Sequence, residues 1–474
     1  MTVVKTVLIA CDTFAPDRNG TATFSKNLAC GLQSRGYEIH VVAPAISRLY
    51  GTFREQHDGV EIIVHRLKSR RIPFHPTQRY VNPIGLGRKV VGLVAAVSPD
   101  LVHVQSHINI GHHAALAALK SDIRLIATSH IDSESLIENS VVAPKFIKRF
   151  LSAKLLQGAS RILKSADVLV TPTPRAAALL ERVVSKKKVL TISGGVNLEN
   201  YESVSAPRQS AKTVLYVGRL DREKHVYVLL EALARVPKDI NLEIVGSGAQ
   251  EAELIALSHE LGLADRCSFY TDLTDIEVVE RLSDATVFVM PSTQELQSMA
   301  TLEALAAGRP IVAAKAMALP NLVKDGVNGF LYKPDSPNDL AAKLTAIFGL
   351  PKKEFDAFAE ESKKISLQND LARTIDNYEL VYANRAEEVL DGSREAKLES
   401  KDTLTNLFGA LVRKGVSGIE RGSSGVLARL DGVRGSVSET FGDVRFSIER
   451  RSRRAAKKLS SSLRKALERI RRDD

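Results

Sequence analysis

The chain has 474 residues, more than the roughly 250 to 300 at which a single hydrophobic core stops growing, so at least two domains are expected. Its 44% hydrophobic and 26% charged residues are ordinary for a folded protein and exclude a disordered or fibrous chain. The formal net charge of +11 is uneven, because residues 445–474 carry twelve Lys or Arg against four Asp or Glu.

The three cysteines are Cys11, Cys30 and Cys267, and their wide, irregular spacing argues against a zinc site or a disulfide framework. A reducing compartment is therefore expected. The apolar run at residues 7–11 is too short for a membrane span and lacks the basic leading region of a signal peptide, so it is interpreted as a buried strand. These features favour a cytoplasmic protein.

Residues 1–197 alternate short β-branched runs with longer segments of helical periodicity, which predicts a parallel sheet covered by helices. A helix is expected at residues 22–35. The expected strands are residues 3–10, 38–42, 101–104, 125–128, 168–170 and 189–192. This half is therefore predicted to be a Rossmann-like, doubly wound domain, and the polar stretch 197–212 marks its end.

A second alternating set predicts another Rossmann-like domain at residues 212–372. Its expected strands are residues 214–217, 242–245, 287–290 and 311–314. Strong helix formers follow at residues 352–390, and the helix at 373–391 is expected to cross back to the first domain. Two such domains are predicted to face a central cleft. Residues 392–474 read as a basic amphipathic tail whose glycines weaken its helix propensity.

The first strand is followed by a loop that ends in Asn19 and Gly20, directly before the expected helix. Small residues at such a turn allow backbone N–H groups to face an anion at the helix N-terminus, although many α/β proteins use the same residues only to turn. The segment has no complete G-x-G-x-x-G fingerprint, which argues against a dinucleotide-dependent dehydrogenase.

The first strand of the second domain leads into residues 218–224, which contain Arg219 and Lys224. An arginine and a lysine five residues apart at the carboxyl end of a strand can both reach a diphosphate. The alternative interpretation is a solvated loop of charges, which the position in the domain makes less favourable. A Gly246-Ser247-Gly248 turn follows the next strand.

Residues 292–310 carry the strongest signal, because they place Glu295 in a loop and Glu303 about two turns along the following helix. A carboxylate accepts two hydroxyl hydrogen bonds, so one of these residues can hold sugar hydroxyls and the other ribose hydroxyls. Ser298 and Met299 lie between them, where a helix N-terminus would offer N–H groups to phosphate.

This segment resembles the E-x7-E signature of the retaining glycosyltransferases of family 4, which have the GT-B fold. The resemblance extends over roughly residues 4–390 and includes residues 195–197, 218–224, 246–248 and 325–329. It implies that Arg219 and Lys224 bind the donor diphosphate, that Glu303 binds the ribose and that Glu295 binds the transferred sugar.

The same resemblance implies further contacts on both domains. His130 matches a family histidine near the reacting sugar, and the Asn19-Gly20 loop would approach the diphosphate from the first domain. The residues implied as catalytic are His130, Arg219, Lys224 and Glu295. Those implied to bind the donor are Asn19, Gly20, Arg219, Lys224, Gly246, Glu295, Ser298, Met299 and Glu303.

The chain departs from the family pattern at three places. Ser298 stands where a glycine is usual, residues 316–320 replace a common double-glycine loop, and Asn19 stands where a second glycine is frequent.

The resemblance implies retention at the anomeric carbon, giving an α-glycoside, with the donor phosphate as the base toward the acceptor hydroxyl. The donor is expected to be a UDP- or GDP-linked hexose. No other cofactor is expected, and no metal, since the sequence has no Asp-x-Asp of the kind that metal-dependent transferases use.

The basic tail predicts attraction to an anionic membrane and hence a lipid acceptor, with the enzyme peripheral on the inner face of the plasma membrane. The loop sequence around Ser298 is similar to the corresponding loop of diacylglycerol glucosyltransferases and phosphatidylinositol mannosyltransferases. Arg66, Lys68, Arg70 and Arg71 are expected to add a second membrane contact.

Several alternatives stay open. The tail would also suit a disordered solubilising segment, while nucleic-acid binding is disfavoured. The acceptor could instead be a soluble sugar or a polysaccharide. A noncatalytic membrane- or nucleic-acid-binding scaffold is disfavoured, because it would have no reason to keep Arg219, Lys224, Glu295 and Glu303 together.

Overall fold

The computed structural model describes residues 4–17, 19–71, 79–130, 162–184 and 188–389, and the tail predicted at 392–474 lies outside these ranges. The chain divides into two units, of which the first comprises residues 1–397. The first unit contains all the helices and strands described below.

Within the described ranges, the first sheet has eight strands, all parallel except β3, which forms an antiparallel hairpin with β4. In spatial order they are β10 (Leu190–Thr191), β9 (Val168–Thr171), β8 (Arg124–Thr128), β7 (Leu101–Val104), β1 (Thr6–Ala10), β2 (Glu38–Pro44), β4 (Val60–Leu67) and β3 (Gly51–His57). A separate antiparallel ribbon joins β5 (Ser69–Arg71) to β6 (Arg79–Val81).

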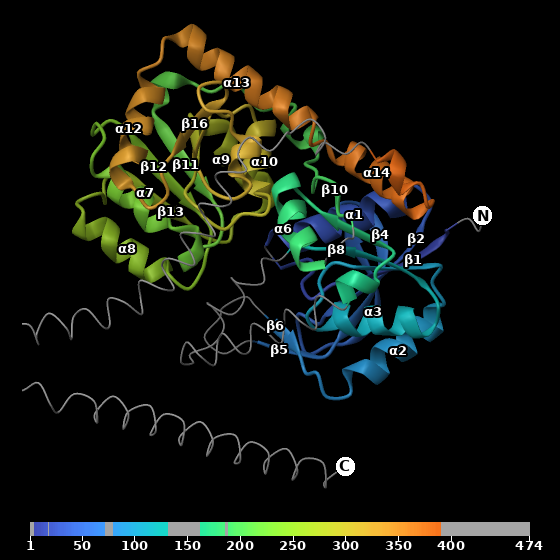
Figure 1. The fold of residues 1–474 in the computed structure, drawn as a ribbon. Helices are drawn as coiled ribbons and strands as arrows, with labels where there is room; N and C mark the ends of the chain where they lie inside the picture. The colour runs from blue at the N-terminus through green and yellow to red at the C-terminus, as the bar shows by residue number, and fades with distance from the viewer. Residues whose placement is uncertain (1–3, 18, 72–78, 131–161, 185–187, 390–474) are drawn as a thin grey trace, which may run out of the picture. The chain divides into compact units, whose positions relative to one another are not determined.

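The inner strands of this sheet are buried on both faces, and because successive side chains of a strand point to opposite sides, each strand contributes to two cores. Val7 and Ile9 of β1 pack in the core formed with α1 (Gly20–Ser34) and α14 (Leu371–Tyr382). Leu8 and Ala10 pack on the other side with α2 (Leu86–Val97) and α3 (Ile110–Lys120). Figure 1 shows α1 beside α14, and α2 beside α3.

The second sheet is wholly parallel and has six strands. In spatial order they are β13 (Cys267–Tyr270), β12 (Asn241–Val245), β11 (Thr213–Val217), β14 (Val287–Met290), β15 (Ile311–Ala314) and β16 (Gly329–Tyr332). The helices of this domain are α7 (Val226–Leu233), α8 (Glu251–Glu260), α9 (Asp275–Asp284), α10 (Met299–Ala306), α11 (Leu319–Leu322), α12 (Pro337–Phe348) and α13 (Lys352–Leu367).

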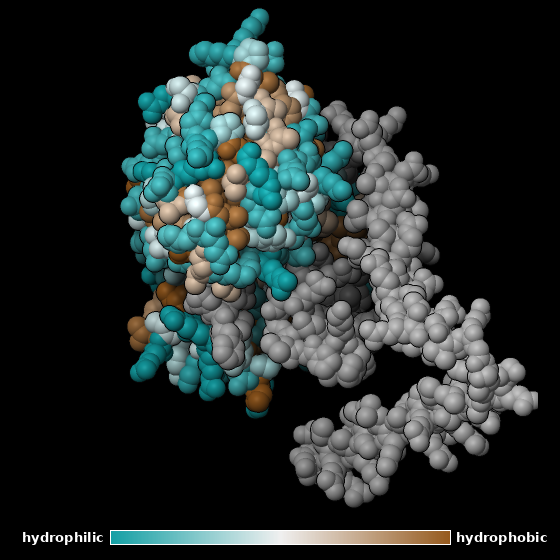
Figure 2. All heavy atoms as spheres, turned by 90° about the vertical axis from the view of Figure 1, so that its left-hand side faces the viewer, coloured by the Kyte–Doolittle hydropathy of each residue, from teal (hydrophilic) through white to brown (hydrophobic). Residues whose placement is uncertain are grey.

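The apolar strands of this sheet and the inner faces of its helices form a separate core between Val196 and Ile365. The outer surface of this domain is polar where α7, α8 and α12 cover it. Figure 2 shows that this side is mostly hydrophilic, with hydrophobic residues in small groups. Among the helices within the described ranges, none combines the length and the apolarity that a membrane crossing requires.

The end of the described chain returns to the first domain. Val196 N donates to Asn369 O at 2.9 Å and Leu371 N donates to Val196 O at 3.0 Å, so the segment leaving the first domain pairs with the one coming back. The helix α14 then contributes Ile375, Tyr378 and Tyr382 to the first core. The predicted fold of two Rossmann-like domains is confirmed.

Candidate active site

Two loops at the carboxyl edge of the second sheet are fastened to each other. A side chain at Gly246 would place its Cβ only 1.9 Å from Gly218 O, so the close approach requires glycine at this position. Leu220 N donates to Ser247 O at 2.9 Å, and Asp221 Oδ1 accepts from Ala249 N at 3.1 Å. The loop that carries Arg219 and Lys224 is therefore held firmly at the edge of the sheet.

Both predicted phosphate-binding cations are paired with carboxylates. Arg219 Nη2 lies 2.6 Å from Glu223 Oε1, and its Nη1 pairs with Asp221. Lys224 Nζ lies 2.6 Å from Glu295 Oε1, and both side chains are mostly buried, with 16% and 11% exposed. The structure thus joins the Arg-Lys loop directly to the glutamate predicted to hold the sugar.

The loop around Glu295 contains conformational strain and unused polar atoms. Glu295 O accepts from Ala318 N at 3.1 Å, and the neighbouring Met317 has a φ of +43°, which a non-glycine residue rarely adopts. Among the described residues, the buried Gln294 Oε1 and Asn321 Nδ2 have no hydrogen-bond partner.

The helix α10 begins later than the sequence predicted. Glu303 is its fifth residue, about one turn in rather than two, because residues 294–297 form a loop and Ser298 is the N-cap. Ser298 Oγ accepts from Thr301 N at 3.3 Å. With a φ of −113°, Ser298 does not need the conformational freedom of the glycine usual in the family.

Glu303 lies in an environment that disfavours its charge. Burial, and then the nearby carboxylate of Asp275, raise the pKa of Glu303 to about 7, while Lys26 of α1 acts in the opposite direction. The carboxyl group is therefore close to half ionised at neutral pH. Its capacity to accept two hydroxyl hydrogen bonds depends on pH in the physiological range.

The loop after β1 brings a second helix N-terminus toward α10. Asn19 caps α1, since its Oδ1 accepts from Ala22 N at 3.0 Å and its Nδ2 donates to Thr13 Oγ1 at 2.8 Å. The Asn19 side chain therefore makes its hydrogen bonds within the loop, and the group of this turn that can bind a ligand is the backbone of Gly20. A Cβ at Gly20 would lie 3.5 Å from Met299 Cγ, so the N-termini of α1 and α10 approach each other.

Three hydrogen bonds connect the loop before α10 with first-domain loops. Gln297 Oε1 accepts from Gly194 N at 2.6 Å, and Gln297 Nε2 donates to Ser193 Oγ at 2.7 Å. Thr173 Oγ1 donates to Leu296 O at 2.7 Å. Residues 296–299 therefore contact both the segment before α6 (Pro174–Val184) and the segment after β10.

His130 follows β8 and ends a buried polar network. Burial lowers the pKa of His130 to about 4, so the imidazole is neutral, and its Nε2 donates to Gln105 Oε1 at 2.9 Å. Gln105 Nε2 lies 3.2 Å from His103 Nε2, and His103 Nδ1 lies 2.7 Å from the Tyr382 hydroxyl of α14. The histidine's ring also lies against Phe24 of α1, with centroids 4.6 Å apart. His130 is therefore a fixed, uncharged hydrogen-bonding group.

One cation near the site was not predicted from the sequence. Arg175 lies at the start of α6, next to the Thr173 that binds Leu296 O. Burial lowers the pKa of Arg175, and its Nε has no hydrogen-bond partner in the described part of the chain. The sequence did offer one signal for this residue, because Arg175 directly follows Pro174, the proline that begins a helix shortly after a strand.

Arg66, which the sequence placed on a membrane-facing surface, is instead 4% exposed. Its guanidinium donates to Glu55 Oε1 at 2.8 Å, to Ala15 O at 2.7 Å and to Pro44 O at 3.2 Å. The prediction was wrong because Arg66 lies within β4, where a carboxylate and two carbonyl groups accept its hydrogen bonds.

Over the described residues, no group of three or more His, Cys, Asp or Glu side chains is arranged to hold a metal ion.

Two parallel α/β sheets, with functional loops at their carboxyl edges and a last helix that returns to the first domain, define a glycosyltransferase of the GT-B class. Residues 18–200 match the family model described as Glycosyltransferase Family 4, and residues 198–365 match the model described as Glycosyl transferases group 1. The chain therefore carries a domain of each of these two glycosyltransferase families and is a glycosyltransferase enzyme.

The named relatives agree with the assignment as a glycosyltransferase. The chain is 25% identical over 357 residues to a D-inositol 3-phosphate glycosyltransferase of Xylanimonas cellulosilytica, an alignment that covers 70% of this chain and 84% of the relative. It is 24% identical over 382 residues to an alpha-monoglucosyldiacylglycerol synthase of Streptococcus pneumoniae, covering 76% and 82%. Its fold is similar to that of sucrose-phosphate synthase from Thermosynechococcus elongatus, with a TM-score of 0.66, 20% identity, and coverage of 80% and 98%.

Proposed function

We propose that this enzyme transfers a hexose from a UDP- or GDP-linked donor to a hydroxyl group of a membrane lipid, with retention, to give an α-glycoside. The observation that carries the proposal is the 2.6 Å contact between Lys224 Nζ and Glu295 Oε1. It brings together a cation suited to the donor diphosphate and a carboxylate suited to the sugar hydroxyls, beside the N-terminus of α10.

Donor binding exchanges ion-pair partners. The diphosphate replaces the carboxylates that pair with Arg219 and Lys224, and the loss of Lys224 frees Glu295 to accept hydrogen bonds from sugar hydroxyls. Phosphate binding and sugar recognition are therefore coupled through one contact. Glu303 accepts the ribose hydroxyls on the adjacent turn of α10.

The chain's contribution to the chemistry is electrostatic. Arg219, Lys224 and the backbone N–H groups at the start of α10 and α1 stabilise the charge that develops on the departing diphosphate. A donor phosphate oxygen takes the proton of the acceptor hydroxyl, which attacks on the face that the leaving group vacates. His130 is neutral, so it orients a sugar hydroxyl by hydrogen bonding and carries no charge in the reaction.

Two kinds of acceptor are suggested by the relatives, whose names contain a phosphorylated inositol in one case and a diacylglycerol glycolipid in the other. The lipid acceptor is preferred because of the basic segment 445–474, which suits an anionic membrane on the cytoplasmic side. A soluble acceptor is the second candidate. Deleting the residues after Gly392 should abolish glycosylation of vesicle-bound lipid but leave a reaction with a soluble acceptor unchanged.

The donor is tested by a thermal-shift screen of the full chain with UDP, GDP, ADP and their sugar conjugates. A nucleotide at a hundred times its Kd stabilises a protein by about 2.7 kcal/mol, which raises the unfolding midpoint measurably. Arg219→Ala should abolish the shift. Arg222→Ala, an exposed arginine of the same loop, is the matched control and should retain it. If no nucleotide shifts the midpoint at millimolar concentration, the proposed donor class is wrong.

A further inference from the structure

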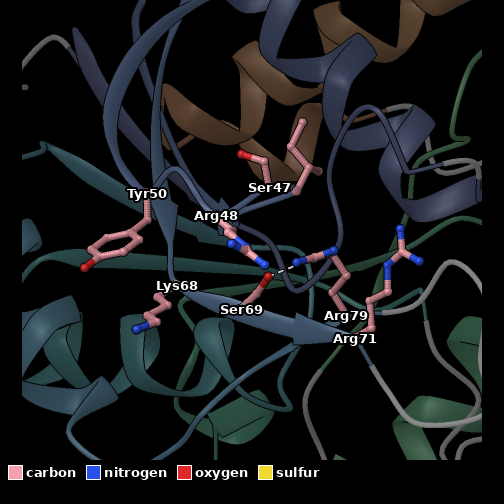
Figure 3. A pocket seen from close by; sticks show the side chains of 8 residues that line it. Ser47, Arg48, Tyr50, Lys68, Ser69, Arg71 and Arg79 are labelled. Carbon is pink, nitrogen blue, oxygen red and sulfur yellow. Dashed lines mark hydrogen bonds between the residues drawn. The ribbon is translucent and has the colours of Figure 1, made fainter.

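A pocket of about 710 Å³ opens at the carboxyl edge of the first sheet, away from Glu295. Its walls come from the segment after β2, the segment after β4 and the strand β6. The lining residues are Ile46, Ser47, Arg48, Tyr50, Lys68, Ser69, Arg71 and Arg79. Figure 3 shows the hydrogen bond between Arg79 and Ser69, with the side chain of Arg48 also drawn among the lining residues. The pocket is therefore built from three segments that the fold brings together.

The side chains of this basic pocket are strongly positive. Its four cations are Arg48, Lys68, Arg71 and Arg79, and none of its described lining residues is a carboxylate. Like charges gathered in this way repel one another, and an anion with several negative oxygens removes the repulsion. The carboxylate of Asp17 interacts electrostatically with Arg79 and with the buried Arg66, so it offsets only part of this positive charge.

Part of the pocket is held in place by hydrogen bonds. Arg79 Nε donates to Ser69 Oγ at 2.8 Å, and the Ser69 hydroxyl donates to Ala45 O. Lys68 Nζ lies 5.7 Å from the centre of the Tyr50 ring, a cation–π distance. An arginine and a lysine are thus oriented by their neighbours.

The pocket adjoins the loop that faces α10. The strand β2 pairs directly with β1, and strands lie roughly 5 Å apart, so segments that follow them at one edge are neighbours. Arg79 also acts electrostatically on Asp17, which lies two residues before Asn19. The backbone of Gly20 in this loop lies against Met299. The basic pocket therefore lies beside the loop that carries Asn19 and Gly20.

We infer that the basic pocket binds a phosphate group of the acceptor, so that the enzyme glycosylates a phosphate-bearing acceptor in preference to a neutral one. This inference rests on the proposed function and specifies its acceptor. Arginine guanidinium groups pair with phosphate in a two-pronged geometry, and the lysine adds a point charge. The same chemistry is presented by a soluble phosphorylated polyol and by the headgroup of an anionic lipid. Tyr50 of the pocket is 55% exposed and its chain neighbour Leu49 is 72% exposed, so the test also measures binding to lipid.

The test uses the full chain and the double variant Arg48→Gln, Lys68→Gln, which removes two charges without breaking the Arg79–Ser69 bond. The matched control is Arg54→Gln, which removes an exposed charge from β3 in the same domain. Calorimetry measures the binding of inositol 3-phosphate and of inorganic phosphate, with inositol as the uncharged comparison. Cosedimentation measures binding to vesicles of phosphatidylglycerol and of phosphatidylcholine. UDP and GDP binding is measured on every protein.

The inference predicts that the double variant binds inositol 3-phosphate at least tenfold more weakly than the wild type, while the control binds normally and inositol binds to none of them. Loss of phosphatidylglycerol binding by the double variant, with no binding of the soluble phosphates to the wild type, supports the lipid headgroup as the source. Equal binding of every phosphate-bearing probe to wild type and double variant overturns the pocket assignment. Failure of the wild type to bind any nucleotide overturns the proposed function instead, and the phosphate titration still decides the pocket.

Discussion

Glu303 makes nucleotide binding depend on pH. With a pKa of about 7, this carboxyl group is ionised to roughly 10% at pH 6 and roughly 90% at pH 8. Ribose hydroxyls donate hydrogen bonds to the ionised form, so the apparent affinity follows the ionised fraction. We expect the association constant of UDP or GDP to rise roughly tenfold from pH 6 to pH 8, about 1.4 kcal/mol.

The assay is calorimetric titration of the nucleotide at several pH values, in buffers that differ in ionisation enthalpy. Binding near pH 7 should release close to half a proton from Glu303. The nucleotide phosphate also titrates in this range, and Glu303→Gln is the control, because the phosphate contributes equally to both proteins. Asp275→Asn should move the wild-type profile to lower pH, since Asp275 helps to raise the Glu303 pKa.

In the free protein, Glu303 gives folding stability a pH dependence opposite to that of nucleotide affinity. Its pKa in the folded state is higher than the ordinary 4.5, so the folded state retains a proton that the unfolded state releases, and stability falls as pH rises from about 4.5 to about 7. Glu303→Gln should therefore stabilise the free chain at pH 8, by at most roughly 3 kcal/mol, and have little effect at pH 4. A wild-type to variant affinity ratio that stays constant between pH 6 and pH 8 would refute the reasoning.

Two further predictions concern local geometry. Ser298→Ala should lower stability by about 1 kcal/mol, because Thr301 N loses its cap, whereas Ser298→Gly should cost only a few tenths, and urea unfolding distinguishes these values. Equal effects would contradict the capping role. Gly246→Ala should lower the melting temperature and weaken nucleotide binding, since its Cβ meets Gly218 O at 1.9 Å. Gly92→Ala, in the open on α2, is the control and should stabilise by about 0.5 to 1 kcal/mol; a harmless Gly246→Ala would show that the two loops can separate.

The interior strands were predictable because a buried parallel strand is a short, continuous apolar run. Residues 101–104, 287–290 and 311–314 coincide with β7, β14 and β15. The hairpin of β3 and β4 escaped prediction, because β3 is a largely polar edge strand that alternates between exposed and half-buried residues. The short ribbon of β5 and β6 carries mostly arginine and other polar residues, and so gave no apolar signal either.

Only the parts of the site that lie in sequence motifs or directly after strands were predictable. The sequence placed Arg219, Lys224 and Glu295 in loops at the carboxyl ends of strands. It could not show which carboxylate each cation would pair with, nor that Asp275 and Lys26 would flank Glu303, because these contacts join elements remote in sequence. Arg175 was missed because its burial, and the contact of the nearby Thr173 with Leu296, depend on segments more than a hundred residues apart.

The return of α14 has a consequence for the order in which the enzyme folds during synthesis. The second core lies wholly between Val196 and Ile365, so it is complete before α14 leaves the ribosome. The first core waits for Ile375, about 180 residues after its own Ile192, a delay of roughly 10 to 40 s at usual rates of translation. The domain made first is thus finished last, with an apolar sheet face uncovered in the interval, and a chain that stops before residue 371 would present that face to chaperones.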